Sequence, residues 1–343
     1  MTVIDAVLHA LSISFAMTWE ILWALILGFT LSAIVEAVVS KAQLSRLLPD
    51  DSPRSLGLAT LLGAASSSCS YAAVALARSL FIKGADFTAA MTFEIASTNL
   101  VIELGIVLVI LMGWQFAAAE FVGGAVMIVL LALLFRAFLK RRMIEAARSQ
   151  AEKGLRGYME GHAAMDMSVS DGTLLRKIFS AKGFTAISHL FVMNWASVIR
   201  DIVLGLLIAG AIAAWVPETF WKAFFLTEQP QLALLWGPIV GPLVSVVSFV
   251  CSIGNVPLAA VLWNNGISFG GVISFIFADL IILPILSIKR RYYGTRMTMF
   301  LFVTFYAAMA LAGLLVELLF GALGLIPTAR NALVAEPSLS WNY

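Results

Sequence analysis

Charged residues are scarce in this chain of 343 residues. Asp, Glu, Lys and Arg make up 12% of it and hydrophobic residues 61%, and the mean hydropathy is +0.96. Soluble domains typically carry about 25% charged residues, so the composition excludes an ordinary soluble domain. It predicts a polytopic membrane protein surrounded by a lipid bilayer. The net charge of +2 is too small to indicate a nucleic-acid partner.

Cysteines and catalytic motifs are also few. The chain has two cysteines, both inside apolar segments, which argues against a disulfide framework. No basic start with a small-residue cleavage site precedes the first apolar run, so no signal peptide is expected. The sequence contains no Walker A loop and no HExxH motif. We therefore expect neither an enzyme nor an ATP-driven pump, and no cofactor.

A duplicated segment is the clearest positive signal. Residues 57–83 and 239–265 are both apolar runs with a Cys-Ser pair at mid-length, and an offset of 182 residues places Cys69-Ser70 on Cys251-Ser252. The same offset superposes further identical residues: Val74 on Val256, Leu76 on Leu258, Ala77 on Ala259, Leu80 on Leu262, Gly84 on Gly266, Phe87 on Phe269, Phe93 on Phe275 and Ala96 on Ala278. The sequence therefore predicts that the chain contains an internal duplication.

The repeat suggests a division of the chain into a first transmembrane repeat (1–139), a linker (140–183) and a second transmembrane repeat (184–343). Within the first repeat we expect a short interfacial helix over residues 1–17 and a separate spanning helix from about residue 19 to 39. One continuous helix is expected over about residues 86–112. The hydrophilic linker is expected to prolong the helix that precedes it, and Lys289 to Arg296 are expected to form a basic loop.

The positive-inside rule constrains how the Cys-Ser segments meet the membrane. If the segment around Cys251 crossed the bilayer, Arg290, Arg291 and Arg296 would lie on the external face. If both Cys-Ser segments dip in and return, the basic loops and the 140–183 linker are all cytoplasmic. The predicted fold is therefore all-α, with two inverted repeats that each hold about three full spans and one re-entrant hairpin. Eight plain spans, with Cys-Ser as a packing point, remain the alternative.

Each hairpin arm has about 12 residues, or about 18 Å of helix, which reaches the midplane of a bilayer but does not cross it. Paired broken helices at that depth are typical of a transport site. Cys69 and Cys251 could supply two soft ligands to a substrate, with Ser70, Ser252 and Asn255 as weaker polar contacts. The alternative is that both cysteines are small buried hydrophobic residues with inert thiols.

Polar residues also occur in the helices that follow the hairpins. Glu94, Asn99 and Glu103 lie in the first half and Asp279 in the second, within a few residues of the predicted midplane. Charges at that depth normally face a partner or a water-filled path. All four are candidates for the site, and the three carboxylates are candidates for ion coupling. Alternatively, the carboxylates stay protonated and hydrogen-bond a neighbouring helix.

The linker contains a weaker metal-binding pattern. His162, Met165 and Met167 lie close together in YMEGHAAMDM, and imidazole and thioether groups bind soft metal ions. The same residues also occur by chance in a linker.

The doubled pattern of a Cys-Ser pair, a glycine about fifteen residues later and an FxxA helix resembles the predicted permeases that include the ArsP-type organoarsenical efflux permeases and the YraQ-like proteins. The resemblance covers residues 19–323 and implies an inner-membrane permease. For some members it implies efflux of trivalent organoarsenicals. This chain departs from the pattern at Glu94, Glu103 and Asp279, which favours a cationic substrate or proton coupling.

The sequence thus predicts a secondary transporter that exports a soft metal or metalloid species through a site between two hairpins. Two alternatives stay open: a channel-like passive pore, and a carrier of a sulfur-containing small anion that uses a tip cysteine. A homo-oligomer is also left open.

Overall fold

The computed structural model describes residues 3–38, 48–68, 70–152, 178–248, 252–330 and 332. Over these ranges the chain is all-helical, with no β-strand. The first half contains α1 (Val3–Val38), α3 (Pro53–Ser66), α4 (Ser70–Ile82), α5 (Phe87–Asn99), α6 (Ile102–Met112), α7 (Trp114–Phe138) and α8 (Arg141–Ala151). The second half contains α11 (Ala181–Trp215), α12 (Glu218–Phe224), α13 (Pro230–Ser248), α14 (Ser252–Asn264), α15 (Phe269–Phe277), the 3-10 helix η2 (Ala278–Ile281), α16 (Leu283–Tyr293) and α17 (Thr295–Ala322).

The helix boundaries follow the 182-residue offset of the sequence. Both ends of α14 lie 182 residues after the ends of α4. The turns that follow these helices contain Gly84 and Gly266, whose φ angles of 106° and 109° are accessible to glycine and unfavourable for other residues. The next helices begin after Asp86 and Ser268, and both side chains cap the helix by accepting hydrogen bonds from its first backbone N–H groups. Equivalent stretches of sequence therefore form equivalent local structures.

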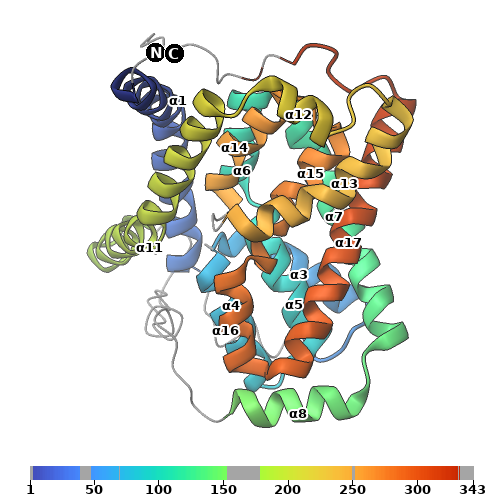
Figure 1. Ribbon diagram of the computed structural model, residues 1–343. Coiled ribbons are helices and arrows are strands. Elements are labelled where there is room, and N and C mark those ends of the chain that lie inside the picture. Colours follow the sequence, from blue (N-terminus) through green and yellow to red (C-terminus); the bar gives the residue numbers. More distant parts are fainter. Residues whose placement is uncertain are drawn as a thin grey trace.

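The two Cys-Ser segments belong to helical pairs in opposite halves of the molecule. Figure 1 shows α3 and α4 in the half that carries α8, and α13 and α14 in the half that carries α12. The packing agrees, because α4 contacts α8 and α16, whereas α14 contacts α6. The N-terminal ends of α4 and α14 are both directed toward the middle of the molecule (Figure 1).

The helix after each of these pairs is broken. The continuous helix predicted over residues 86–112 is wrong, because α5 and α6 meet at a bend of 40°. The hydroxyl groups of Ser97 and Thr98 donate to backbone carbonyls one turn earlier, which weakens the regular hydrogen-bond ladder just before the break. In the second half, α15 with η2 meets α16 at 43°. Pro284 lies at the start of α16, and its nitrogen cannot donate to the preceding turn.

Two helices among the described residues, α7 and α17, are long and apolar enough to cross a membrane, and the number rises to four if each bent pair counts as one span.

Three local predictions were wrong. A single helix, α1, replaces the predicted interfacial helix and separate span. The linker begins with a new helix, α8, because α7 ends at Phe138 and residues 139–140 are extended. Lys289 to Tyr293 are part of α16 and not a loop.

Small residues allow the closest helix contacts. A Cβ atom at Gly63 of α3 would lie 2.6 Å from the carbonyl oxygen of Phe93 in α5, and one at Gly241 of α13 would lie 2.6 Å from Ser274 Oγ in α15. The first helix of each pair is thus packed tightly against the broken helix that follows it. Outside this core, α1 packs along α11 (Figure 1). Ser14 Oγ of α1 donates to the carbonyl of Leu206 in α11 at 2.9 Å.

Candidate functional site

The carboxylate of Asp279 joins the two halves of the chain. Asp279 lies in η2 and has no exposed surface. Its Oδ2 accepts hydrogen bonds from Ser70 Oγ at 2.6 Å and from Ser252 Oγ at 2.7 Å. Asn99 Nδ2 lies 3.5 Å from Oδ1. Residues from α4, α14, α5 and η2 therefore meet at one buried carboxylate, which we call the Asp279 centre.

The position of the two serines explains how they reach the same atom. Ser70 and Ser252 are the first residues of α4 and α14, and they occupy equivalent positions in the two repeats. Both serines are buried. The N-terminal ends of two helices therefore converge on Asp279, and their partial positive charges favour a negative group there. The sequence predicted that Ser70, Ser252, Asn99 and Asp279 share a site, and the structure brings these four together.

Asn99 has one hydrogen-bonding group that no described residue satisfies. Its Nδ2 donates to Thr98 Oγ1 at 3.1 Å and reaches toward Asp279. Its side-chain oxygen is buried and accepts no hydrogen bond from a described residue. Asn99 ends α5 at the break in the helix, so the unused acceptor lies at an irregular part of the backbone.

Glu94 lies in a separate ion pair. Its Oε1 is 2.7 Å from Lys289 Nζ of α16, and neither side chain is exposed to solvent. The Lys289 ammonium also lies 4.2 Å from the centroid of the Phe305 ring. Glu94 and Lys289 come from different repeats, so this buried pair links the two halves as well. The sequence indicated Glu94 but gave no indication of Lys289, which was expected in a loop.

Glu103 contacts the junction between α3 and α4. Ser67 Oγ donates to Glu103 Oε1, and Ser67 adopts a left-handed conformation with φ of 32°. The next residue is held as well, since the Ser68 N–H donates to the carbonyl of Ser97 at 2.8 Å. The first junction is thereby attached to the broken helix α5–α6 at two points.

The remaining predicted site residues divide into two groups. Asn255 donates to Ser245 Oγ at 3.2 Å, within the α13–α14 pair. Cys69, Cys251, His162, Met165 and Met167 lie outside the residues that the structure describes. Over the described ranges there is no group of three or more His, Cys, Asp or Glu side chains that could hold a metal ion.

One buried carboxylate was missed. Glu120 of α7 has no exposed surface, and neither of its oxygens has a hydrogen-bond partner among the described residues. It shares a face of α7 with Gly123, where a Cβ atom would lie 3.0 Å from the ring of Phe277, two residues before Asp279. Its signal in the sequence is a single charge inside the apolar run WQFAAAEFVGG. A charged residue within a spanning helix is by itself a reason to consider a functional role.

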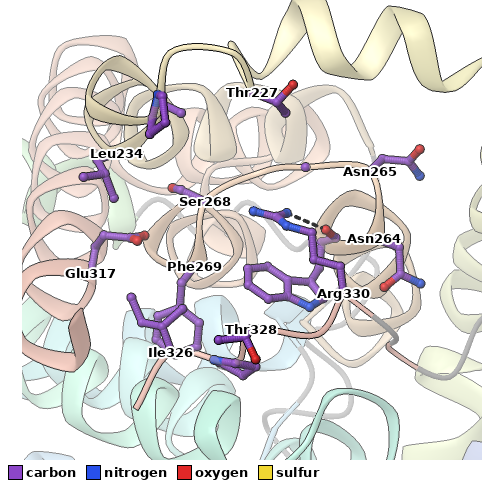
Figure 2. Close-up of a pocket in the computed structure, with 15 residues that line it drawn as sticks. Thr227, Leu234, Asn264, Asn265, Ser268, Phe269, Glu317, Ile326, Thr328 and Arg330 are labelled. Carbon is purple, nitrogen blue, oxygen red and sulfur yellow. Dashed lines mark hydrogen bonds between the residues drawn. The ribbon is translucent and has the colours of Figure 1, made fainter. Parts of the chain in front are cut away.

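A cavity of about 570 Å³ lies away from the Asp279 centre, between α13, α14, α17 and the segment that follows α17. Figure 2 shows Glu317 and Arg330 on different sides of this cavity. Both charges have partners in the fold: Glu317 accepts from the N–H of Gly270, and Arg330 Nη1 donates to the carbonyls of Trp263 and Ile267. Burial lowers the pKa of Arg330 from its ordinary value, and the nearby Glu317 carboxylate opposes this change. These charges are explained by helix capping.

Comparisons with known proteins agree with the membrane character of the fold. Residues 6–318 match a protein family, ArsP_1, described as "Predicted permease". A Mycobacterium tuberculosis protein named "Putative permease Rv2963" is 66% identical over 307 residues, which cover 89% of this chain and 76% of that protein. No solved structure matches the chain.

Proposed function

Because the chain belongs to the predicted permease family of membrane proteins, we propose that it is a secondary transporter whose solute crosses the bilayer at the Asp279 centre. The observation that supports this proposal is the convergence of Ser70 and Ser252 on Asp279 Oδ2. A buried carboxylate that holds the ends of two separate helical pairs can release one pair and keep the other. This is the property that an alternating-access site needs.

The two repeats are inverted with respect to the membrane. Support comes from the opposite placement of the α3–α4 and α13–α14 pairs (Figure 1) and from the 182-residue correspondence of α4 and α14. In this arrangement both pairs are re-entrant hairpins. The α3–α4 hairpin enters from the cytoplasm and the α13–α14 hairpin from the other side. Rocking of either hairpin opens the Asp279 centre to one compartment at a time.

The end of the molecule that carries α8 is cytoplasmic. Basic residues gather there on two elements, α8 with Arg141 and Arg142, and the end of α16 with Arg290 and Arg291. These helices pack against each other, so their positive charges lie on the same side. The positive-inside rule assigns that side to the cytoplasm of an inner membrane. With this orientation the 140–183 linker is also cytoplasmic.

The transported solute is a soft metal or metalloid species, and the direction is export. Cys69 and Cys251 directly precede the two serines that bind Asp279. Thiolates prefer soft metals and metalloids, and the Asp279 carboxylate balances a positive charge on such a solute. The cysteines provide selectivity and Asp279 provides the electrostatic stabilisation.

A ligand screen followed by a flux assay tests this function. The purified protein is heated with Cu(I), with a trivalent organoarsenical and with sulfite, and the melting temperature is compared with that of the Cys69→Ala/Cys251→Ala variant. We expect a rise with one of the first two ligands that is lost in the variant. Flux of that ligand into proteoliposomes is expected to saturate with concentration and to be abolished in Asp279→Asn. Flux that does not saturate and ignores Asp279→Asn would indicate a passive pore and reject the transporter.

A further inference from the structure

Glu120 is a buried acid with no ion-pair partner in the described part of the chain. It lies in the first third of α7, has no exposed surface, and neither carboxylate oxygen accepts a hydrogen bond from a described residue. An ionised carboxylate in the middle of a membrane protein is costly unless a cation or several donors compensate it. The Glu120 carboxylate has neither among the residues that the structure describes. This environment therefore disfavours the bare ionised form and favours a carboxyl group that has bound a proton or another cation.

The packing of α7 places this acid beside the two helix breaks. Gly123 and Gly124 lie one turn after Glu120 and share its face of the helix. A Cβ atom at Gly124 would overlap the side chain of Leu100, at the break between α5 and α6. One at Gly123 would lie 3.0 Å from the Phe277 ring, directly before η2. Glu120 thus lies on the α7 face that packs against both breaks.

Four other charged residues on α7 and the helices around it are already engaged. Glu94 of α5 is paired with Lys289 of α16. Glu103 of α6 accepts from Ser67, and Glu317 of α17 accepts from the Gly270 N–H. Arg136, on α7 itself, binds Asp51 at 2.7 Å near the end of the helix. Asp279 lies two residues after Phe277, whose ring packs against Gly123 on the Glu120 face of α7, and it has the same sign as Glu120.

The hydrogen bonds indicate different protonation states for Asp279 and Glu120. Asp279 accepts from two hydroxyl groups and an amide, which is the pattern of an ionised carboxylate. Glu120 accepts none from the residues that the structure describes, so the ionised form is not stabilised by them. Two neighbouring carboxylates in a medium of low dielectric constant share one proton, because both cannot be charged at low cost.

We propose that Glu120 is a proton-binding site of this protein and that Glu120 and Asp279 together hold one proton. In the resting state the proton is on Glu120 and the negative charge is on Asp279. A cationic solute that binds at Asp279 releases the Glu120 proton to water, which keeps the net charge of the site constant and couples solute movement to counter-movement of protons. This coupling rests on the proposed transport function, whereas the protonation of Glu120 does not.

Infrared spectroscopy of the purified, substrate-free protein tests the site directly. A protonated carboxylic acid gives a carbonyl-stretching band that an ionised carboxylate lacks. We expect such a band at neutral pH in the wild type and its loss in Glu120→Gln. The matched control is Glu145→Gln on α8, which changes an exposed carboxylate and should leave the band in place. A spectrum that is the same in the wild type and Glu120→Gln, without the band, would overturn the proposal.

A second variant allows the proposal to be tested even if Glu120→Gln does not fold. Asp279→Asn removes the neighbouring charge and leaves Glu120 in place, so the band should shift in frequency and remain. If it disappears in Asp279→Asn and persists in Glu120→Gln, the proton is on Asp279 and the assignment is wrong. Sodium chloride provides a further check, since a melting temperature that rises with sodium in the wild type and not in Glu120→Gln would identify a sodium site instead.

Flux measurements separate the two proposals. In proteoliposomes, a Glu120→Gln protein that still binds the solute should lose the acceleration of transport by a proton gradient. If Asp279→Asn leaves solute flux unchanged, the proposed transport function fails while the infrared result still decides the proton site. If the band is lost in Glu120→Gln but the proton gradient drives transport equally in both proteins, the site is correct and its coupling role is rejected.

Discussion

Arg148 and Arg330 lie 182 residues apart and make the same contacts in the two halves of the protein. The Arg148 guanidinium lies 4.3 Å from the centre of the Phe81 ring, and Nη1 donates to the carbonyl of Phe81. The Arg330 guanidinium lies 4.4 Å from the centre of a Trp263 ring, and its Nη1 donates to the carbonyl of Trp263. Each arginine therefore caps the end of an equivalent helix, α4 or α14, although one belongs to α8 and the other to the segment after α17.

Arg148→Gln and Arg330→Gln are expected to destabilise the protein by similar amounts, about 1–3 kcal/mol each, because each removes a cation–π contact and hydrogen bonds to helix carbonyls. Thermal unfolding in detergent measures this. Arg142→Gln, an exposed residue on α8, is the control and should have little effect. A loss confined to one arginine would show that the repeated contacts are not energetically equivalent.

Ser70→Ala and Ser252→Ala are each expected to lower the transport rate, because each removes one of two hydroxyl donors to Asp279 Oδ2. A hydrogen bond to a charged group contributes about 1.5–3 kcal/mol, so a roughly tenfold effect or more is expected. The control is Ser274→Ala, a buried serine whose hydroxyl donates to the carbonyl of Gly271 in its own helix. Equal transport rates in the wild type and the three serine variants would argue against a role of the Asp279 centre in transport.

Lys289→Gln is expected to destabilise the fold by about 3–5 kcal/mol, because it leaves the buried Glu94 without its partner. Adding Glu94→Gln should recover part of that loss, since the second change removes the unpaired charge. Unfolding midpoints of the wild type, both single variants and the double variant give the interaction energy. Additive effects would mean that the 2.7 Å contact contributes no coupling.

Gly124→Ala is expected to cost about 1–3 kcal/mol of stability, because the added methyl group overlaps the Leu100 side chain at the helix break. Leu100→Ala in the same chain should restore part of the loss by making room. Gly57→Ala on α3 is the matched control, since a Cβ atom there meets nothing within 4 Å. It should be neutral or stabilise the helix by up to about 1 kcal/mol.

The repeat was visible in the sequence because identical residues recur at a fixed offset, and the helix ends at Ser70 and Ser252 follow the same offset. The helix breaks were harder to predict. Three polar residues, Ser97 to Asn99, interrupt the apolar pattern just before the first break, but the run from residue 86 to 112 is apolar and long enough to be interpreted as one continuous span. In the second half, Pro284 indicates a helix break, and the first half has no proline at the corresponding position.

The composition and the duplication by themselves determined that this is a membrane protein built from two related halves, and they identified Asp279 and the two serines as candidate partners. The tertiary structure decided which polar groups meet. Glu94 binds Lys289, Glu103 binds Ser67, and Asp279 binds both serines. The physical reason is that helical periodicity fixes which residues share a face of one helix, whereas contacts between helices depend on how distant segments pack. Glu120 illustrates both levels, since the sequence shows its charge and only the packing shows that its carboxylate accepts no hydrogen bond from a described residue.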